Sequence, residues 1–289
     1  MAKTARMLPQ NAERGQKTRN YASILTNAPY SIWMAAFIVV PMLFVGYYAF
    51  TDTEGSFSIS NFAELSRFSQ NFIRSLIFAL STTAITFVIA YPFAYFISRK
   101  GKLAQRIMIM MVLLPMWTNL LIRTQAWRSI LASNGLLNNL LGMIGLGPLT
   151  ILNTPTAVVI GLVYNYLPFM IIPLYTVMTR MDQSLLEAAS DLGANGWKKF
   201  RHVIFPMTMP GVVAGVMMVF VPSLSTFYVA RVLGGVGNLM IGDIIAFEMR
   251  NNFNYNLGAT MSLVLMVIVF ASMGILKRFA SKEAGGKLH

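Results

Sequence analysis

The chain has 289 residues, of which 56% are hydrophobic and only 11% are charged. Soluble domains carry about a quarter charged residues, so this composition excludes an ordinary soluble protein and indicates a polytopic membrane protein. The chain has no cysteine, which excludes disulfides, iron–sulfur clusters and cysteine zinc sites. The two histidines, His202 and His289, form no obvious group with each other, so we predict neither a catalytic nor a metal site.

Six apolar segments are long enough to cross a bilayer, which takes about 20 residues per helix. They span 28–50, 72–97, 103–123, 155–179, 207–230 and 257–276. The first follows a polar, basic tail over residues 1–27, and it is too long for the apolar core of a signal peptide, the competing interpretation. We therefore predict an all-α membrane helix bundle with six transmembrane helices, followed by a short tail over 277–289.

One further apolar stretch, 136–152, is interrupted by three glycines and Pro148. Irregular backbone at membrane depth is tolerated only where protein or water covers it. We expect an interfacial or re-entrant piece here.

The positions of the basic residues predict the orientation. The N-terminal tail, residues 98–106, a polar island from Arg180 to Pro206 and the C-terminal tail together hold 17 of the 23 Lys and Arg residues. The other six lie in the intervening loops: Arg67, Arg74, Arg123, Arg128, Arg231 and Arg250. Because Lys and Arg concentrate in cytoplasmic loops, we expect both termini and the island in the cytoplasm. The net charge of +13 is then a topology signal, and no nucleic-acid motif accompanies it.

Three of the spans contain polar residues and helix breakers at the expected depth of the membrane. Polar groups at that depth usually face the bundle interior or a water-filled cavity. The candidate substrate-pathway residues are Trp117, Thr118, Asn119, Tyr164, Asn165, Phe169, Ser223, Ser225 and Tyr228. The alternative is that the hydroxyls bond back to their own helices and that the two asparagines bridge helices. The sequence leaves both interpretations open.

Two glycine patterns border the fifth span. Gly211 and Gly215 have the spacing that lets helices approach closely, so we expect helix packing there. Gly234 and Gly235 follow the span in an outer loop, near Asp243 and Glu248. These carboxylates could contact a solute-delivery protein or be merely solvated.

The polar island, residues 181–206, has the pattern of two short helices joined by a corner. Asp182 is a candidate N-cap for the first helix, and Gly193 follows the last periodic position, where a left-handed residue commonly ends a helix. Asn195 can cap the second helix, and Pro206 marks the start of the next long one. The first helix is amphipathic and acidic, and the second is basic.

These residues resemble the EAA loop of ABC importer permeases. Glu187, Ala188 and Ala189 are followed by three residues, Gly193, nine residues and then Val203-Ile204-Phe205-Pro206, against a family pattern that ends in I-x-L-P. Val203 and Phe205 depart from that pattern but remain apolar. The resemblance implies a type I ABC importer permease fold over 28–276, with a cytoplasmic coupling helix that docks on a separate ATPase. The coupling residues it implies are Glu187, Ala188, Ala189, Asp191, Gly193, Lys198 and Phe200. An ordinary amphipathic loop at the membrane surface is the alternative.

Further stretches resemble the spermidine/putrescine branch of these permeases, in particular the first of its two permease subunits. They are WTNLLIRTQAW, NGLLNNLL, GLVYNYLPFMIIPLYTVM, LLEAASDLGA and FPMTMPGVVAG. The resemblance implies a heterodimer with a second homologous permease, an ATPase dimer that binds ATP and Mg, an extracytoplasmic solute-binding protein that delivers polyamine, and a prokaryotic inner membrane. The chain itself has no P-loop and is expected to hold no cofactor.

Two observations keep other functions in view. No Asp or Glu lies in a predicted membrane core, so a cationic substrate would rely on aromatic rings such as Trp117 and Tyr164. Related branches carry opines or other small solutes. A secondary transporter that works without an ATPase is the alternative from another class, although such proteins often carry intramembrane ionisable residues. A membrane enzyme is weaker still, because no acid/base pair or nucleophile group can be assembled.

Overall fold

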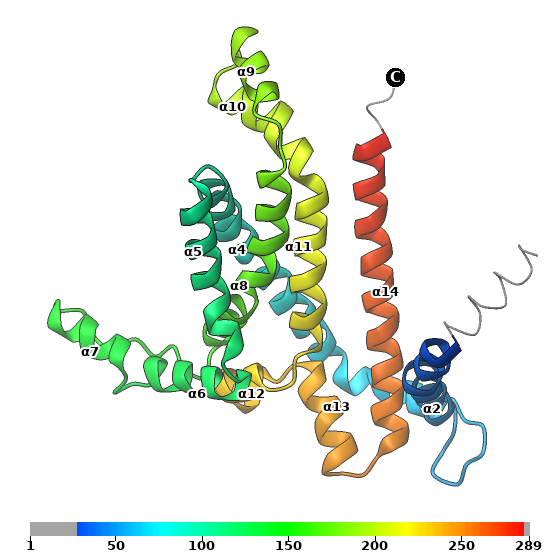
Figure 1. The fold of residues 1–289 in the computed structure, drawn as a ribbon. Helices are drawn as coiled ribbons and strands as arrows, with labels where there is room; N and C mark the ends of the chain where they lie inside the picture. The colour runs from blue at the N-terminus through cyan, green and yellow to red at the C-terminus, as the bar shows by residue number, and fades with distance from the viewer. Residues whose placement is uncertain (1–27, 286–289) are drawn as a thin grey trace, which may run out of the picture.

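The computed structural model describes residues 28–285, and side chains only as far as residue 278. The expected tail over 1–27 and the last four residues lie outside this range. Within it the chain is a bundle of long helices with shorter helices at both ends (Figure 1). One isolated antiparallel bridge, between Thr51 and Phe57, is the β-structure in this part of the chain. The predicted all-α membrane bundle is confirmed.

Three helices form the centre of the bundle: α4 (Ser69–Ser98), α8 (Pro155–Thr179) and α11 (Phe205–Ser225). Their shared core contains Ala90, Ala94, Met170 and Leu174, which are buried. A Cβ on Gly211 would lie 2.9 Å from the carbonyl oxygen of Pro173, and one on Gly215 would lie 2.6 Å from the sulfur of Met170. The two glycines therefore let α11 approach α8 closely, as their spacing predicts.

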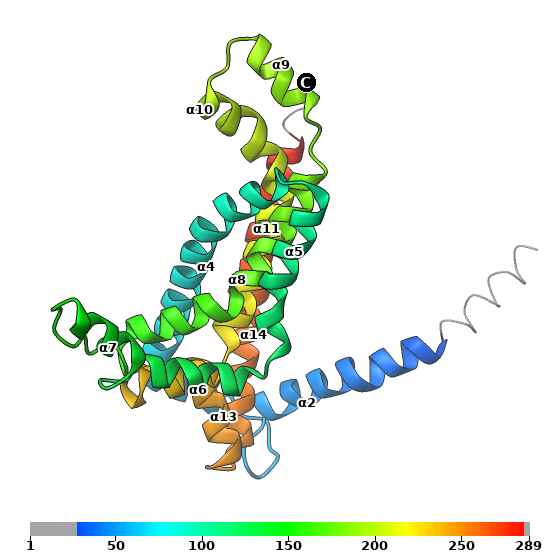
Figure 2. The same ribbon diagram turned by 60° about the vertical axis from the view of Figure 1, so that its left-hand side comes forward.

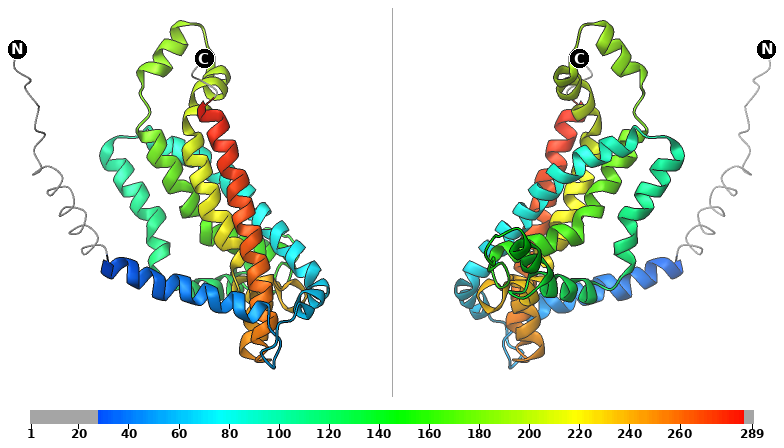
Figure 3. Two further views of the ribbon diagram at one scale, coloured as in Figure 1. Left: turned by 90° about the vertical axis from the view of Figure 1, so that its right-hand side faces the viewer. Right: turned by 90° about the vertical axis from the view of Figure 1, so that its left-hand side faces the viewer.

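The first and last spans lie outside this centre. The first is helical over Ala28–Ala49, with a π-helical segment η1 (Ala35–Val39) before α2 (Val40–Ala49), and it extends away from the bundle (Figure 3). Its end is fixed to α14 (Tyr255–Gly285), where Asn256 donates from Nδ2 to the carbonyl oxygen of Thr51 at 2.7 Å. Helix α14 continues beyond residue 276, the predicted end of the last span.

The third predicted span, 103–123, is not one straight helix. Helix α5 (Lys102–Leu113) continues as the 3-10 turn η3 (Leu114–Trp117), and after a break the chain resumes in α6 (Leu120–Leu131) and α7 (Leu136–Met143) at an angle of 93°. Pro115 removes a backbone donor, and Asn119 begins a new helix by accepting the N–H of Leu121 at 2.8 Å. Five helices in the described range are each long and apolar enough to span a membrane, and the number is six if the bent pair counts as one broken span.

Shorter elements cover the two ends of the bundle. One end carries α9 (Ser184–Asp191), α10 (Gly196–Lys199) and the π-helical η4 (Phe200–Ile204), together with the α4–α5 turn and the end of α14 (Figure 1). The other end carries α3 (Ser60–Glu64), η2 (Leu65–Phe68), α6, α7, α12 (Val229–Gly234), η5 (Val236–Asn238) and α13 (Ile241–Arg250) (Figure 2).

The basic residues separate along the same axis. Arg99, Lys100, Lys199 and Arg278 lie at the first end. Of the six arginines assigned to outer loops, five lie on elements of the second end, and Arg74 lies in the second turn of α4, near that end. We refer to these as the inner and outer ends, because the positive-inside rule places the cation-rich end in the cytoplasm.

Candidate functional site

The loop at the inner end has the predicted helix–corner–helix geometry. Gly193 is left-handed with φ +75°, and the N–H groups of Gly193 and Ala194 bond to the carbonyl oxygens of Ser190 and Ala189, both at 2.9 Å. These two hydrogen bonds form the Schellman motif that ends a helix at glycine. Asn195 then caps α10 by accepting the N–H of Lys198 at 2.9 Å. Local rules alone thus build the corner.

Asp182 was predicted to be the N-cap of the first short helix, but it lies one residue before that position. Gln183 occupies the N-cap position of α9, and the Asp182 carboxylate accepts the N–H of Ser184 at 3.0 Å. Hydrogen bonds from Ser184 lower the pKa of this exposed carboxyl. Asp182 therefore stays ionised next to the positive end of α9.

Most of the coupling residues implied by the resemblance are exposed to solvent. Glu187, Ala188, Asp191 and Lys198 are exposed, Ala189 is half-buried, and apolar side chains accompany them: Leu185, Leu192 and Trp197, of which Leu192 is 88% exposed. Large apolar side chains in a charged cytoplasmic loop are unusual unless a partner covers them. The loop thus presents a mixed apolar and charged surface to whatever lies beyond the inner end.

Phe200 departs from this pattern. Its ring lies 5.6 Å from Tyr91 and 6.0 Å from Phe205, centroid to centroid, and it packs on the buried core shared by α4, α8 and α11. Tyr91 is held in turn by a 2.8 Å hydrogen bond between its hydroxyl and that of Thr208. Phe200 therefore attaches the loop to the bundle rather than presenting itself to a partner.

A second attachment was not apparent from the sequence. Arg99, at the end of α4, donates from Nη1 to the side-chain oxygen of Gln183 and lies over the ring of Tyr95 at 4.8 Å. Within the loop, Lys199 donates from Nζ to the hydroxyl of Ser190 at 3.1 Å, which joins the two short helices. The loop is thus one unit with two anchors, Arg99 on α4 and Phe200 near Tyr91.

The candidate pathway residues on α8 line or approach a cavity in the bundle. Tyr164 packs against Trp127 with a centroid distance of 5.3 Å and borders a cavity of about 300 Å³. The other lining side chains are apolar and come from α4, η3, α5 and α8: Ile89, Phe93, Met111, Val112, Pro115, Leu167, Pro168 and Ile171. Phe169 is half-buried nearby, 6.2 Å from the ring of Tyr166. The broken third span and α8 are therefore brought together, as the pathway interpretation requires.

The polar candidates mostly bond within their own segments. Asn165 donates to the carbonyl oxygen of Gly161 at 2.8 Å and Ser223 to that of Phe220 at 2.9 Å, while Ser225 and Thr118 do the same with Val221 and Pro115. Asn119 serves as a helix cap. Trp117 is 87% exposed at the break, and Tyr228 is half-buried after the end of α11. The alternative of local bonding thus describes the hydroxyls, whereas the cavity itself has an aromatic and apolar wall.

Arg123, which the sequence assigns to an outer loop, is partly buried in the structure. It lies on α6, where its Nε and Nη1 are buried and have no hydrogen-bond partner among the described residues. The break at Thr118 and Asn119 turns it into the protein.

Asp243 is not a solvated loop charge either. It is fully buried, and its carboxylate lies 3.3 Å from Nε of Arg231. Burial raises its pKa to about 7 in spite of the nearby guanidinium. The pair fixes α12 to α13 at the outer end.

Comparisons with known proteins agree with this architecture. The family model described as "Binding-protein-dependent transport system inner membrane component" matches residues 14–283. The chain is 39% identical over 247 residues to the spermidine/putrescine transport system permease protein PotB of Haemophilus influenzae, covering 82% of this chain and 86% of the relative. It is 35% identical to PotB of Escherichia coli, covering 82% and 90%.

A solved structure shares the fold. A bacterial ABC transporter involved in the import of the acidic polysaccharide alginate superposes with a TM-score of 0.76 at 18% identity, covering 94% of this chain and 99% of that one. The same type of transporter, in complex with an alginate pentasaccharide-bound periplasmic protein, gives 0.73 at 18% identity, covering 92% and 97%. With the match over residues 14–283, these findings show that the chain belongs to the family of binding-protein-dependent transport system inner membrane components, as a permease subunit with the ABC importer fold.

Proposed function

We propose that this chain is the first of two permease subunits of an ATP-driven polyamine importer. The observation that carries the substrate is the 39% identity to PotB across 82% of the chain, a relative named for spermidine and putrescine transport. The partners would be a second homologous permease, an ATPase dimer that binds ATP and Mg, and an extracytoplasmic binding protein. The chain would supply part of the pathway and no catalytic residue.

The mechanism is alternating access driven from the inner end. Closure of the ATPase dimer moves the docked α9–α10 unit, and η4 passes that movement directly into α11 because the two are one continuous helical segment, Gly196–Ser225. Arg99 passes it to α4 through Gln183. A switch that runs nearly to completion needs the two docked states to differ by about 5.5 kcal/mol. The two anchors of the loop are suited to transmit this change because they join the loop to two different helices of the bundle, α4 and α11.

Recognition of a polyamine in this subunit would use aromatic rings for its ammonium groups and apolar side chains for its methylene segments. Among the described residues, Glu64 near the outer start of the Ser60–Ser98 span is the one carboxylate in a spanning segment, and the cavity beside Tyr164 has an almost entirely apolar wall. Aromatic faces attract ammonium groups, and an apolar wall suits the methylene segments between them. Carboxylates facing the substrate would then come from the second permease.

Two measurements test this proposal. The complex should be purified from native membranes and its components identified by mass spectrometry, and the co-purified binding protein should be titrated with spermidine, putrescine and an opine. We expect an ATPase, a second permease and a binding protein that prefers a polyamine. Recovery of the chain alone, under conditions that preserve known complexes, contradicts the assembly. A binding protein that prefers an opine contradicts the substrate only.

The alternative is a secondary transporter that needs no ATPase. Uptake that an ionophore abolishes while ATP is held constant would favour it. The exposed apolar surface of α9 and α10 would then have no partner to cover it, which is the observation against this alternative.

A further inference from the structure

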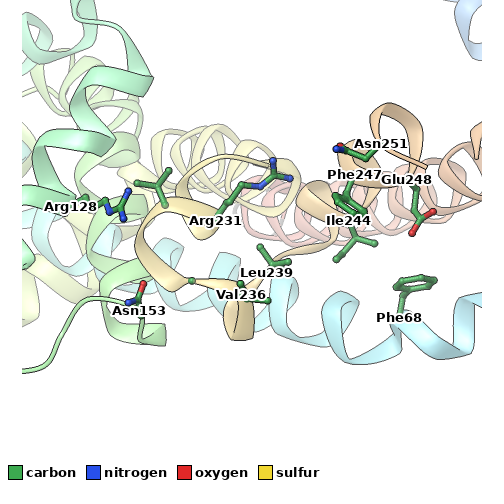
Figure 4. Close-up of a pocket in the computed structure, with 12 residues that line it drawn as sticks. Phe68, Arg128, Asn153, Arg231, Val236, Leu239, Ile244, Phe247, Glu248 and Asn251 are labelled. Atoms are coloured by element: carbon green, nitrogen blue, oxygen red, sulfur yellow. The ribbon is translucent and has the colours of Figure 1, made fainter. Parts of the chain in front are cut away.

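The outer end of the molecule contains a cavity of about 850 Å³ that the sequence did not indicate. It lies among η2, α6, α12, η5 and α13 at the outer end, and Figure 4 shows the side chains that line it. Its lining includes Arg128, Asn153, Arg231, Val236, Phe247 and Glu248.

The wall of this cavity is held in place by hydrogen bonds from distant parts of the chain. Asn71 and Arg74 on α4 donate to the carbonyl oxygens of Leu239 and Gly237. Asn238 donates to the carbonyl oxygens of Asn153 and Gly234, at 3.2 and 2.8 Å. The η5 turn is therefore fixed on both sides, and the cavity is formed before any ligand arrives, which lowers the entropy cost of binding.

The charges of the cavity are arranged asymmetrically. Arg128 lies at one end, Glu248 lies at the other, and Arg231 lies between them (Figure 4). Arg231 is paired with Asp243, and Glu248 accepts a hydrogen bond from Asn252 at 2.9 Å. Arg128 is exposed and has no hydrogen-bond or ion-pair partner among the residues that the structure describes. It is the free cation of a preformed cavity.

We propose that this cavity receives an acidic loop of the extracytoplasmic binding protein, with a carboxylate of that loop paired to Arg128. The inference rests on the proposed function, which supplies the partner, and adds where and by what chemistry it docks. A guanidinium pairs well with a carboxylate because its N–H groups match the two oxygens. Val236 at the rim is 88% exposed and offers an apolar contact beside the charge.

The test titrates the binding protein against the complete complex in lipid nanodiscs and follows ATP hydrolysis. Three variants are compared with the wild type. Arg128→Glu reverses the charge in the cavity, Arg128→Lys keeps it, and Arg67→Glu reverses an exposed outer arginine that does not line the cavity. We expect Arg128→Glu to raise the half-saturating concentration of binding protein about tenfold or more, since reversed charges at an interface repel. The rate at saturating binding protein should recover, and the other two variants should stay within about twofold of wild type.

A salt series separates pairing from a general disturbance. Raising the ionic strength should weaken the wild-type response more than that of Arg128→Gln, because only the wild type has a charge pair to screen. Superimposable titrations of wild type and Arg128→Glu overturn the inference and leave the proposed function standing. An equal rise in the half-saturating concentration for Arg67→Glu also overturns it. So does a loss of ATP hydrolysis in Arg128→Glu that is already present without binding protein, because that loss indicates a lipid headgroup in the cavity. A wild-type complex that no binding protein stimulates overturns the proposed function, and this inference with it.

Discussion

The two ends of this molecule are built on opposite plans. At the outer end, the loops after α11 are tied down by side chains from far along the chain, such as Asn71, Arg74 and Ser75, and they enclose a cavity. At the inner end, the α9–α10 unit stands clear of the bundle, has no buried residue in either short helix, and is attached through Arg99 and Phe200. Under the proposed function, the outer end receives the binding protein and the inner end docks into the ATPase.

This difference has a mechanical meaning. A receiving surface gains from being fixed in advance, because fewer groups must be ordered on binding. A coupling unit such as α9–α10 must instead keep its own shape while it moves relative to the bundle. The inner unit meets that requirement with local interactions, the Schellman corner at Gly193 and the Asn195 cap, which do not depend on the rest of the protein.

The corner is the position where a substitution should have the largest effect. Gly193 has φ +75°, and a Cβ there would meet no atom within 4 Å, so any cost is conformational rather than a clash. Gly193→Val should reduce transport at least tenfold, because a β-branched residue at positive φ is a genuine outlier. Gly193→Asn, which tolerates this conformation, and Gly196→Ala, at ordinary φ, are the controls. The measurement is uptake per inserted transporter beside ATP hydrolysis; normal uptake by Gly193→Val means that the corner does not transmit force.

The anchor on α4 should matter less, because Phe200 remains as a second attachment. Arg99→Gln removes the charged donor to Gln183, and we expect a several-fold loss of transport per ATP hydrolysed. Lys100→Gln is the matched control, since Lys100 lies over the ring of Phe96 at 4.3 Å and its side chain makes no hydrogen bond or ion pair to the loop among the described residues. Equal stoichiometry in both variants would remove Arg99 from the coupling route.

At the outer end, loss of the hydrogen bonds of one side chain should have a local effect. Asn238→Ala removes two donations to backbone oxygens, and the η5 turn should lose about 1–2 kcal/mol of local stability. Hydrogen exchange of the amides over 234–240 should quicken, whereas Asn139→Ala, at an exposed position on α7, should leave it unchanged. Unaltered exchange in Asn238→Ala would contradict a cavity fixed in advance.

The smallest effect concerns pH. Burial raises the pKa of Asp243 to about 7 from 3.8, so between these values the folded protein holds a proton that the unfolded chain has released. The stability of the α12–α13 region should therefore fall as pH rises from about 4 to about 7. Asp243→Asn should flatten this dependence, measured as amide exchange of α13, corrected for intrinsic rates, at pH 5 and pH 8. A stability that rises with pH, or an unchanged slope in the variant, contradicts the assignment.

Local signals in the sequence were sufficient for the inner loop and for the central helices. Gly193, Asn195 and the pair Gly211 and Gly215 act through rules that span a few residues, and each was predicted from its neighbours. The all-α bundle followed from the apolar segments, because a bilayer fixes both their length and their composition.

The remaining features depend on contacts that a local pattern does not contain. Hydropathy continues through Thr118 and Asn119, so it gives no sign that the chain turns by 93° there and carries Arg123 inward. Arg99 meets a residue 84 positions away, and Asp243 is buried by packing among the outer loops. The outer cavity arises from the same kind of long-range contact, which is why its arginines were counted only as topology signals.

The most direct test of the whole account uses the absence of cysteine in the natural sequence. A single cysteine is introduced at Leu192, which is 88% exposed on the inner loop, or at Phe270, which is exposed on the apolar surface of α14. Each variant is treated in native membranes with a short thiol-to-amine cross-linker. The account predicts that Leu192→Cys yields a covalent product containing an ABC ATPase and that Phe270→Cys does not. Absence of that product from Leu192→Cys, in membranes where the transporter is active, would contradict the claim that the loop is inserted into an ATPase.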